Sequence, residues 1–345
     1  MGDNALNLAI RSLLGPNFRI RHIELLRNRF GFRERWPLAR ADLNILGGGG
    51  LFHSFGPEGQ PARRTGTLWN IELRHVARLR VPVLGFGLGF NHFSGDPPPL
   101  PAMADLLELM LSKTPLVSFR NDGSVARLVD AFPQFEGRLL EIPDPGVFFR
   151  PPPAKPTTVE GGVPYGVLQL AMDRPHLRYG PHWDRVVALL RHLVGRSPVP
   201  LVLVPHTPDD DREYRSLTAS LGVSSEPFTP DPEATARVIG LYAGADFTIS
   251  TRGHSQICSV GNQTATFSLS THPKVTGFAA SAGIGEWCVD PLTMEEDAIV
   301  ERFDRFLSQR GEIQAGLASV NERFDREISS FVERINAFLA ERSET

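Results

Sequence analysis

The stretch ADFTISTRGHSQICSVGNQTATFSLS, residues 245–270, holds two short runs rich in β-branched and aromatic residues, with a polar segment between them. The runs 245–251 and 263–270 have the length and composition of buried strands. Arg252, Gly253 and His254 follow the first run directly, where a helix is expected to begin. A strand, a helix and a second strand in this order are typical of an α/β fold.

The same alternation extends through the rest of the chain. Apolar runs predict further strands at 42–48, 81–89, 115–120, 165–172 and 199–206. Apolar residues at helical spacing predict amphipathic helices at 67–80, 182–194 and 209–222. Two successive sets of β/α units predict two doubly wound, Rossmann-like domains that face each other across a cleft.

A segment rich in proline and glycine, FFRPPPAKPTTVEGG at 148–162, separates the two sets and is predicted to lack regular structure. We therefore expect an N-terminal domain over 1–148, a linker over 149–162 and a C-terminal domain over 163–345. The last segment, from about 294 to 342, is helical by its period. Its apolar stripe is rich in Phe, which indicates core packing.

Composition places the chain among folded soluble proteins. Of its 345 residues, 41% are hydrophobic and 22% are charged, and the formal net charge of −3 gives no footprint of nucleic-acid binding. Cys258 and Cys288 are expected to be reduced thiols, since two cysteines form no disulfide framework. No apolar run approaches the roughly 20 residues that cross a bilayer, and the first residues do not resemble a signal peptide. We therefore expect a cytoplasmic protein without a transmembrane segment.

Three nitrogen-bearing side chains are predicted at the ends of strands in the second half of the chain. Arg252 and His254 follow one strand, and Lys274 follows the next. Ligands in such folds bind at the carboxyl ends of the strands, where a helix N-terminus adds N–H groups and partial positive charge. The arrangement predicts a pocket for a small anion, in which His254 can exchange a proton near neutral pH. The alternative is a purely structural cluster in contact with water.

Arg120 and His206 also end predicted strands. The guanidinium of Arg120 suits a carboxylate or phosphate ligand, although an ordinary ion pair fits the position equally well. A lone histidine such as His206 is more often structural than catalytic, and contact with substrate is the alternative. No metal-ligand spacing surrounds it, so we predict no protein-built metal site.

Glycines follow two of the strands in the first half of the chain. Gly48 and Gly49 lie in ILGGGGLF, where they form either a close approach to a ligand or a tight turn. Gly87 lies in GFGLGF, which lacks the glycine spacing of a dinucleotide site, so NAD binding is not predicted. We expect this second segment to form a glycine-rich lip of the cleft.

In order and spacing, several motifs resemble the polysaccharide pyruvyl transferase family: GDNAL, ILGGGGLF, GFGLGF, SFRNDGS, IPDPGVFF, ISTRGHSQ and HPKVTGFAASAGI. They run from residue 2 to about 290, and Arg-x-His followed by Lys is the most specific part. The resemblance implies a fold similar to GT-B glycosyltransferases. It also implies a transferase that moves an enolpyruvyl unit from phosphoenolpyruvate (PEP) to two sugar hydroxyls, leaving a ketal, in exopolysaccharide biosynthesis.

The resemblance implies a catalytic acid/base, His254, and three ligands of PEP, which are Arg252, Lys274 and Arg120. It implies a saccharide acceptor on the N-terminal domain, PEP on the C-terminal domain, and no cofactor or metal. An acceptor carried by a lipid would require only peripheral membrane association. The chain departs from the family pattern at Asn121, where Asp is usual, and at Gly253, where Leu is frequent.

Two other functions stay open. A nucleotide-sugar glycosyltransferase of the same fold would need an acidic residue for a ribose, and Asp144, Asp246 and Asp290 are candidates. The unusual Gly253 is also compatible with a glycan-binding protein that has lost catalysis.

The start of the chain differs from the family pattern. Family members have a strand just before the GD motif, whereas Met1 adjoins Gly2 and Asp3 here. The resemblance therefore implies that the first strand of the N-terminal domain is missing. We expect either a longer natural chain or a marginally stable domain, because the sheet would have an unpaired edge.

Overall fold

The computed structural model describes residues 2–16, 18–21, 37–53, 65–69, 71–92, 97–172, 179–229, 231–270 and 272–343. Contacts divide the chain into two compact units. Unit 1 comprises Met1–Ala5 and Gly146–Arg323, and unit 2 comprises Leu6–Pro145 and Phe324–Thr345.

Two helices contribute residues to both units, and this distinguishes the units from the predicted domains. Helix α1 (Gly2–Leu14) is divided after Ala5, and helix α12 (Glu296–Ser343) is divided after Arg323. The domain boundaries predicted from the sequence, 1–148, 149–162 and 163–345, remain a prediction.

Unit 2 contains a parallel sheet with the strand order β1-β3-β5-β6. Its strands are β1 (Asn44–Gly47), β3 (Val83–Leu88), β5 (Val117–Arg120) and β6 (Leu140–Ile142). Every residue of β3 and β5 is buried, as expected for central parallel strands covered on both faces. A smaller parallel pair joins β2 (Phe52–His53) to β4 (Phe90–Asn91).

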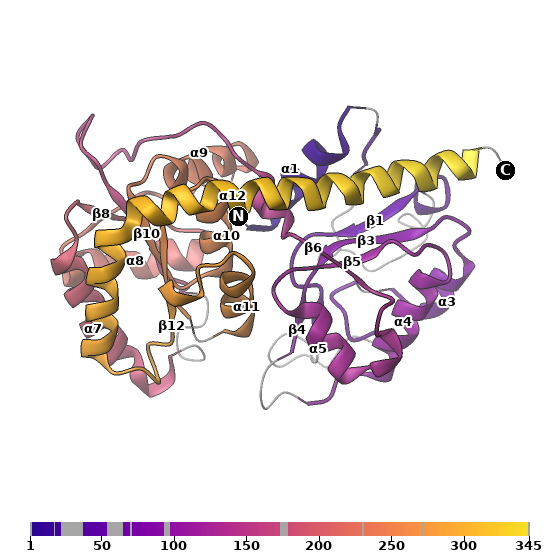
Figure 1. The fold of residues 1–345 in the computed structure, drawn as a ribbon, viewed down its shortest axis with the longest axis horizontal. Helices are drawn as coiled ribbons and strands as arrows, with labels where there is room; N and C mark the ends of the chain where they lie inside the picture. Colours follow the sequence, from indigo (N-terminus) through magenta and orange to yellow (C-terminus); the bar gives the residue numbers. More distant parts are fainter. Residues whose placement is uncertain are drawn as a thin grey trace. The chain divides into compact units, whose positions relative to one another are not determined.

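The helices of unit 2 pack their apolar residues with the sheet into one core. The helices that contribute to this core are α3 (Leu73–Arg78), α4 (Pro101–Leu111) and α5 (Ser124–Ala131). A short 3₁₀ turn follows at Pro133–Phe135, and another, Pro145–Phe148, begins at the last residue of this segment of unit 2 and continues in unit 1. Strands and helices alternate along this unit, and the strands run in one direction, as shown in the purple part of Figure 1.

Unit 1 contains a six-stranded parallel sheet with the order β12-β11-β10-β7-β8-β9. Its strands are β7 (Gly166–Gln169), β8 (Leu201–Leu203), β9 (Ser224–Ser225), β10 (Phe247–Ser250), β11 (Thr266–Leu269) and β12 (Cys288–Val289). Its helices are α7 (Trp183–Arg196), α8 (Pro208–Leu221), α9 (Pro232–Ala243), α10 (Gly253–Gly261) and α11 (Pro273–Ser281), with 3₁₀ turns at Gly180–His182 and Gly285–Trp287.

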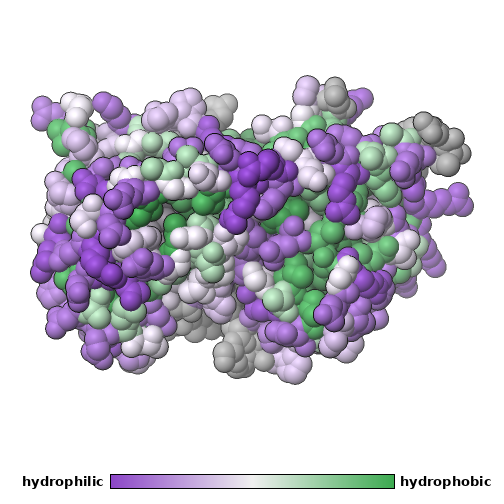
Figure 2. Space-filling model, viewed as in Figure 1, coloured by the Kyte–Doolittle hydropathy of each residue, from purple (hydrophilic) through white to green (hydrophobic). Residues whose placement is uncertain are grey.

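Helix α12 is amphipathic along its length. Its buried residues are Ile299, Phe303, Phe306, Leu317, Asn321, Phe324, Ile328, Phe331 and Ile335. Its outward face is hydrophilic, as Figure 2 shows. The phenylalanine-rich stripe therefore packs into the cores, as its spacing predicts.

The proline-rich segment has neither helix nor strand between 149 and 165, as predicted. It is nevertheless fixed to unit 1. The backbone N–H of Ala154 donates to Gly240 O over 2.8 Å, and the buried carboxylate of Glu226 accepts hydrogen bonds from the N–H and hydroxyl of Thr157.

Two local predictions for unit 2 are wrong. The helix expected at 67–80 begins only at Leu73, because Thr67 instead pairs with Phe52 in an isolated bridge and Leu68 donates to Leu51 O. The segment GFGLGF does not form a lip. Most of it lies in β3, and Val83–Phe90 is buried throughout.

Candidate functional site

The carboxyl end of β10 in unit 1 places Arg252 and His254 at the start of α10. Arg252 is the N-cap residue with extended backbone angles, and the nine-residue helix begins at Gly253. His254 is the second helical residue, and its side chain is half-buried. Orphan N–H groups and the helix dipole give this position a partial positive charge beside the two side chains.

Lys274 lies beside this turn. It is the second residue of α11, which follows the neighbouring strand β11, and the Nδ1 of the N-cap residue His272 accepts a hydrogen bond from its backbone N–H over 3.3 Å. A Cβ added at Gly253 would lie 3.3 Å from Cε of Lys274. The stem of Lys274 therefore packs against the residue between Arg252 and His254. Glycine at position 253 leaves room for this stem.

The structure thus brings together three of the predicted site residues within unit 1: Arg252, His254 and Lys274. Arg252 is also held by a carboxylate, since its Nη2 donates to both oxygens of Asp210 over 2.9 and 3.1 Å. Two permanent cations and an imidazole beside two helix N-termini can bind a compact anion and exchange a proton with it.

His206 does not line this surface. Its side chain is buried, and its Nε2 lies 2.7 Å from the hydroxyl of Tyr242. Burial, followed by the nearby Arg252 guanidinium, lowers the pKa of His206 well below its usual range. The structure therefore favours a structural role over the predicted alternative of substrate contact.

We expect the stability of unit 1 to fall with pH below about 6.5 because of His206. In the unfolded chain this imidazole takes up a proton near that pH, whereas the folded protein keeps it neutral. The free energy of unfolding should then drop by about 1.4 kcal/mol per pH unit until the folded pKa is reached. Urea unfolding of wild type and His206→Gln between pH 7.5 and 5 measures this slope.

The control for this experiment is His182→Gln, which changes an exposed histidine of the same unit. His206→Gln should show a flatter pH dependence, and His182→Gln should follow wild type. Equal slopes in wild type and His206→Gln would contradict the assignment.

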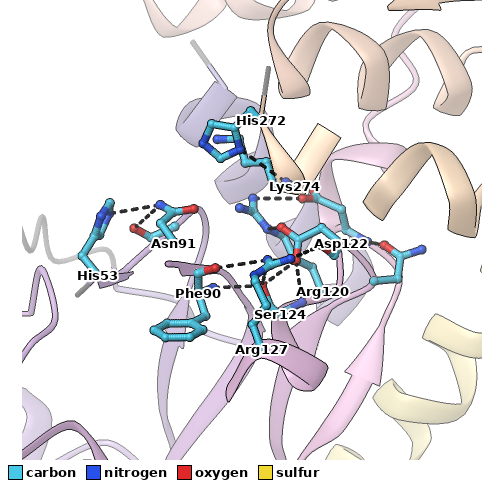
Figure 3. A network of polar contacts seen from close by, with 12 residues as sticks. His53, Phe90, Asn91, Arg120, Asp122, Ser124, Arg127, His272 and Lys274 are labelled. Atoms are coloured by element: carbon cyan, nitrogen blue, oxygen red, sulfur yellow. Dashed lines mark hydrogen bonds and ion pairs between the residues drawn. The ribbon is translucent and has the colours of Figure 1, made fainter. Parts of the chain in front are cut away.

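Arg120 ends β5 in unit 2, as predicted, but its guanidinium is inside an ion-pair network (Figure 3). Nε donates to Asp122 over 2.6 Å and Nη1 donates to Asp144 over 3.2 Å, and all three side chains are at most 4% exposed. Burial opposes the charge of Arg120, but the two carboxylates outweigh it and raise the pKa of Arg120. Arg120 is therefore a charge-compensated residue of the core of unit 2.

The network of Arg120 and Asp122 extends to β4, the strand that pairs with β2. The hydroxyl and N–H of Ser124 donate to Asp122, and the same hydroxyl accepts from the N–H of Phe90 over 2.9 Å. Arg127 donates to Phe90 O over 3.2 Å, so Ser124 and Arg127 together fix β4 (Figure 3).

The glycines predicted as substrate contacts have structural explanations. Gly48 and Gly49 adopt φ of 85° and 75°, the left-handed region that favours glycine, in the turn after β1. At Gly87 φ is 60°, and a Cβ would lie 2.7 Å from the ring of Pro145. The turn alternative is sufficient for Gly48 and Gly49, whereas Gly87 lies inside β3, where its positive φ and the close approach of Pro145 favour glycine.

The sequence analysis missed Asp210 and the pair formed by His53 and Asn91. Asn91 Nδ2 lies 3.1 Å from Nε2 of His53 at the ends of β4 and β2 (Figure 3). The available signal for Asp210 was its position three residues after Thr207, the spacing of a helix capping box. No such local spacing marked His53 and Asn91.

In the part of the chain that the structure describes, no helix is both long and apolar enough to cross a membrane. Those same residues include no group of three His, Cys, Asp or Glu side chains arranged to hold a metal ion.

Comparison with known proteins gives one family and one fold. The model of the family described as polysaccharide pyruvyl transferase matches residues 1–273. No curated protein matches the sequence. Among solved structures, a glycosyltransferase from Rickettsia africae ESF-5 is similar with a TM-score of 0.51 and 14% identity, over 93% of this chain and 85% of that chain.

Weaker similarities have lower TM-scores. The UDP-GlcNAc 2-epimerase from Neisseria meningitidis bound to UDP-GlcNAc has a TM-score of 0.48 and 12% identity, over 78% of this chain and 72% of that chain. A GtfA/B complex has a TM-score of 0.45 and 12% identity over 77% of this chain, which spans only 54% of that chain. The Rickettsia similarity and the two larger parallel sheets confirm the predicted fold class, α/β with two Rossmann-like domains similar to GT-B.

Proposed function

Since the chain belongs to the polysaccharide pyruvyl transferase family, we propose that it transfers a pyruvyl group from PEP to two hydroxyls of a saccharide, forming a ketal. The observation that carries this proposal is the packing of Lys274 against Gly253, which gathers Arg252, His254 and Lys274 at adjacent strand ends. PEP is compact and carries a carboxylate and a phosphate. Two cations and two helix N-termini supply the matching positive charge.

In the proposed reaction, His254 donates a proton to the methylene carbon of PEP, and C2 becomes electrophilic. A sugar hydroxyl forms a C–O bond to C2 and gives its proton to a base. The bond between C2 and the phosphate oxygen then breaks with its electron pair left on the phosphate. A second hydroxyl bonds to C2 and gives its proton to the departing phosphate, which completes the ketal and releases inorganic phosphate. Arg252 and Lys274 bind the donor and stabilise the departing phosphate. These steps are redox-neutral, and we propose PEP as a substrate with no cofactor.

The acceptor is proposed to bind unit 2, where the family resemblance places it. We propose that the backbone around Gly48 and Gly49 contacts this sugar. Arg120 was expected to contact PEP, but its two buried ion pairs favour a structural role.

The second candidate is a nucleotide-sugar glycosyltransferase. Its ribose would need a carboxylate, but each predicted candidate already has another bonding role. Asp144 pairs with Arg120, Asp246 pairs with Arg310 over 3.0 Å, and Asp290 accepts a hydrogen bond from the N–H of Leu292 over 2.8 Å. Of the three, Asp144 is 0% exposed, which removes it as a ribose ligand and to that extent favours PEP over a nucleotide sugar as the donor.

We expect PEP to bind saturably in a calorimetric titration, with an affinity that falls as salt is raised, because charge dominates the interaction. Inorganic phosphate should compete weakly, and UDP or GDP should not displace PEP. Lys274→Ala should weaken binding, whereas Arg196→Ala, which removes an exposed cation of the same unit, should not.

Two other outcomes would contradict the proposal. Tight binding of a nucleotide sugar without any binding of PEP would indicate that the chain is a glycosyltransferase. Binding of a glycan without turnover of PEP would indicate a member that has lost catalysis.

A further inference from the structure

A buried carboxylate, that of Asp210, lies beneath the proposed donor site. The side chain is 0% exposed. Its Oδ1 accepts from the N–H of Met172 over 2.8 Å, and its Oδ2 accepts from the N–H groups of His206 and Thr207 over 2.9 and 3.1 Å. Three backbone donors therefore fix its position and stabilise its charge.

The fourth donor to Asp210 is Nη2 of Arg252, which reaches both carboxylate oxygens. Met172 follows β7, His206 and Thr207 follow β8, and Arg252 follows β10. One carboxylate thus joins the polypeptide after three neighbouring strands of the sheet.

Helix capping does not account for this arrangement. Asp210 is the third residue of α8, and its bond to the N–H of Thr207 completes a capping box. A capping box needs neither Met172 nor Arg252, both of which come from other parts of the chain. The contact with Arg252 restricts a long side chain that would have many rotamers if it were not paired.

We propose that Asp210 is a positioning residue that holds the Arg252 guanidinium in the orientation used to bind the anionic donor. This inference rests on the proposed function for the identity of the donor, which is PEP. Arg252 is oriented before the donor arrives, so binding does not have to restrict its rotamers.

The negative charge of Asp210 acts in the opposite direction, since it partly offsets the positive charge of Arg252. Three N–H dipoles point at this carboxylate and reduce its field at the surface. We therefore expect the loss of orientation to outweigh the loss of the opposing charge when Asp210 is neutralised.

The test is a double-mutant cycle on PEP affinity in the full chain. Asp210→Asn should raise the dissociation constant of PEP about tenfold, whereas in an Arg252→Ala background the same change should have an effect of less than about twofold. Unchanged or tighter binding of PEP by Asp210→Asn would overturn the proposal, as would an equal loss in both backgrounds.

The matched control is Glu226→Gln. Glu226 is also a buried carboxylate of unit 1, is 1% exposed, accepts a backbone N–H from Thr157 and pairs with Arg237 over 2.8 Å. Its replacement should reduce stability but leave PEP affinity near wild type. A comparable loss of affinity in Glu226→Gln would show that Asp210→Asn acts through stability alone, and would overturn the positioning role.

A second measurement separates this inference from the proposed function. Phenylglyoxal modification of Arg252, followed by mass spectrometry, needs no PEP, and Asp210→Asn should speed it several-fold. If Asp210→Asn does not change the rate of Arg252 modification, the positioning role of Asp210 is wrong, regardless of the result of the PEP titration. If the rate rises but wild type does not bind PEP, the proposed donor is wrong and the pairing role of Asp210 stands.

Arg252→Lys covers the case in which Asp210→Asn does not fold. Lysine keeps the charge but lacks the planar guanidinium that bridges to Asp210. It should weaken PEP binding nearly as much as Arg252→Ala. Near-wild-type affinity in Arg252→Lys would overturn the proposal.

Discussion

His254→Ala is expected to lower turnover of PEP by about 100-fold or more while the dissociation constant of PEP stays near wild type. The proposed role of this imidazole is proton transfer to the methylene carbon, an interaction made in the transition state. The side chain is half-buried at the start of α10, beside the two permanent cations that are proposed to bind the donor. Single-turnover kinetics and calorimetric titration measure the two quantities separately.

Arg252→Ala is compared with His254→Ala in order to separate binding of PEP from proton transfer. It should weaken PEP binding, because it removes a cation from the site rather than a proton donor. His182→Ala, at an exposed position of unit 1, should leave both quantities unchanged. If His254→Ala and Arg252→Ala reduce binding equally, the division of roles between them is wrong.

The sequence was sufficient for the fold class and for most of the strand ends. Parallel strands covered on both faces are continuous apolar runs, so β8, β10 and β11 could be placed from local composition. The polar residues that follow such strands collect at one edge of the sheet. That rule alone was enough to group Arg252, His254 and Lys274, and the packing of Lys274 against Gly253 confirms that these residues lie together.

Partners distant in the sequence could not be predicted, because they depend on how the strands are ordered in the sheet. Asp210 precedes Arg252 by 42 positions, and their ion pair depends on β7 lying between β8 and β10. The same holds for Arg120 and Asp144, which are 24 positions apart and are joined through the pairing of β5 with β6. An arginine at a strand end looks alike in the sequence whether it binds a ligand or a buried carboxylate.

Arg120→Met is therefore expected to destabilise unit 2 by about 3–5 kcal/mol, because it leaves buried carboxylates without their cation. Asp122 and Asp144 are 4% and 0% exposed, so water cannot replace the guanidinium without opening the core. A methionine fills much of the volume, which makes the lost charge the main change. Urea unfolding followed by a probe in unit 2 measures the free energy of unfolding.

The matched control is Arg138→Met, which breaks an ion pair with Glu108 in the same unit. Both of those side chains are more than 40% exposed, so water solvates the remaining carboxylate and stability should change little. The two variants together separate a buried ion pair from an exposed one. If Arg120→Met instead unfolds like wild type but binds PEP weakly, Arg120 is a donor ligand, as the family resemblance implies, and its ion pairs with Asp122 and Asp144 contribute little to folding.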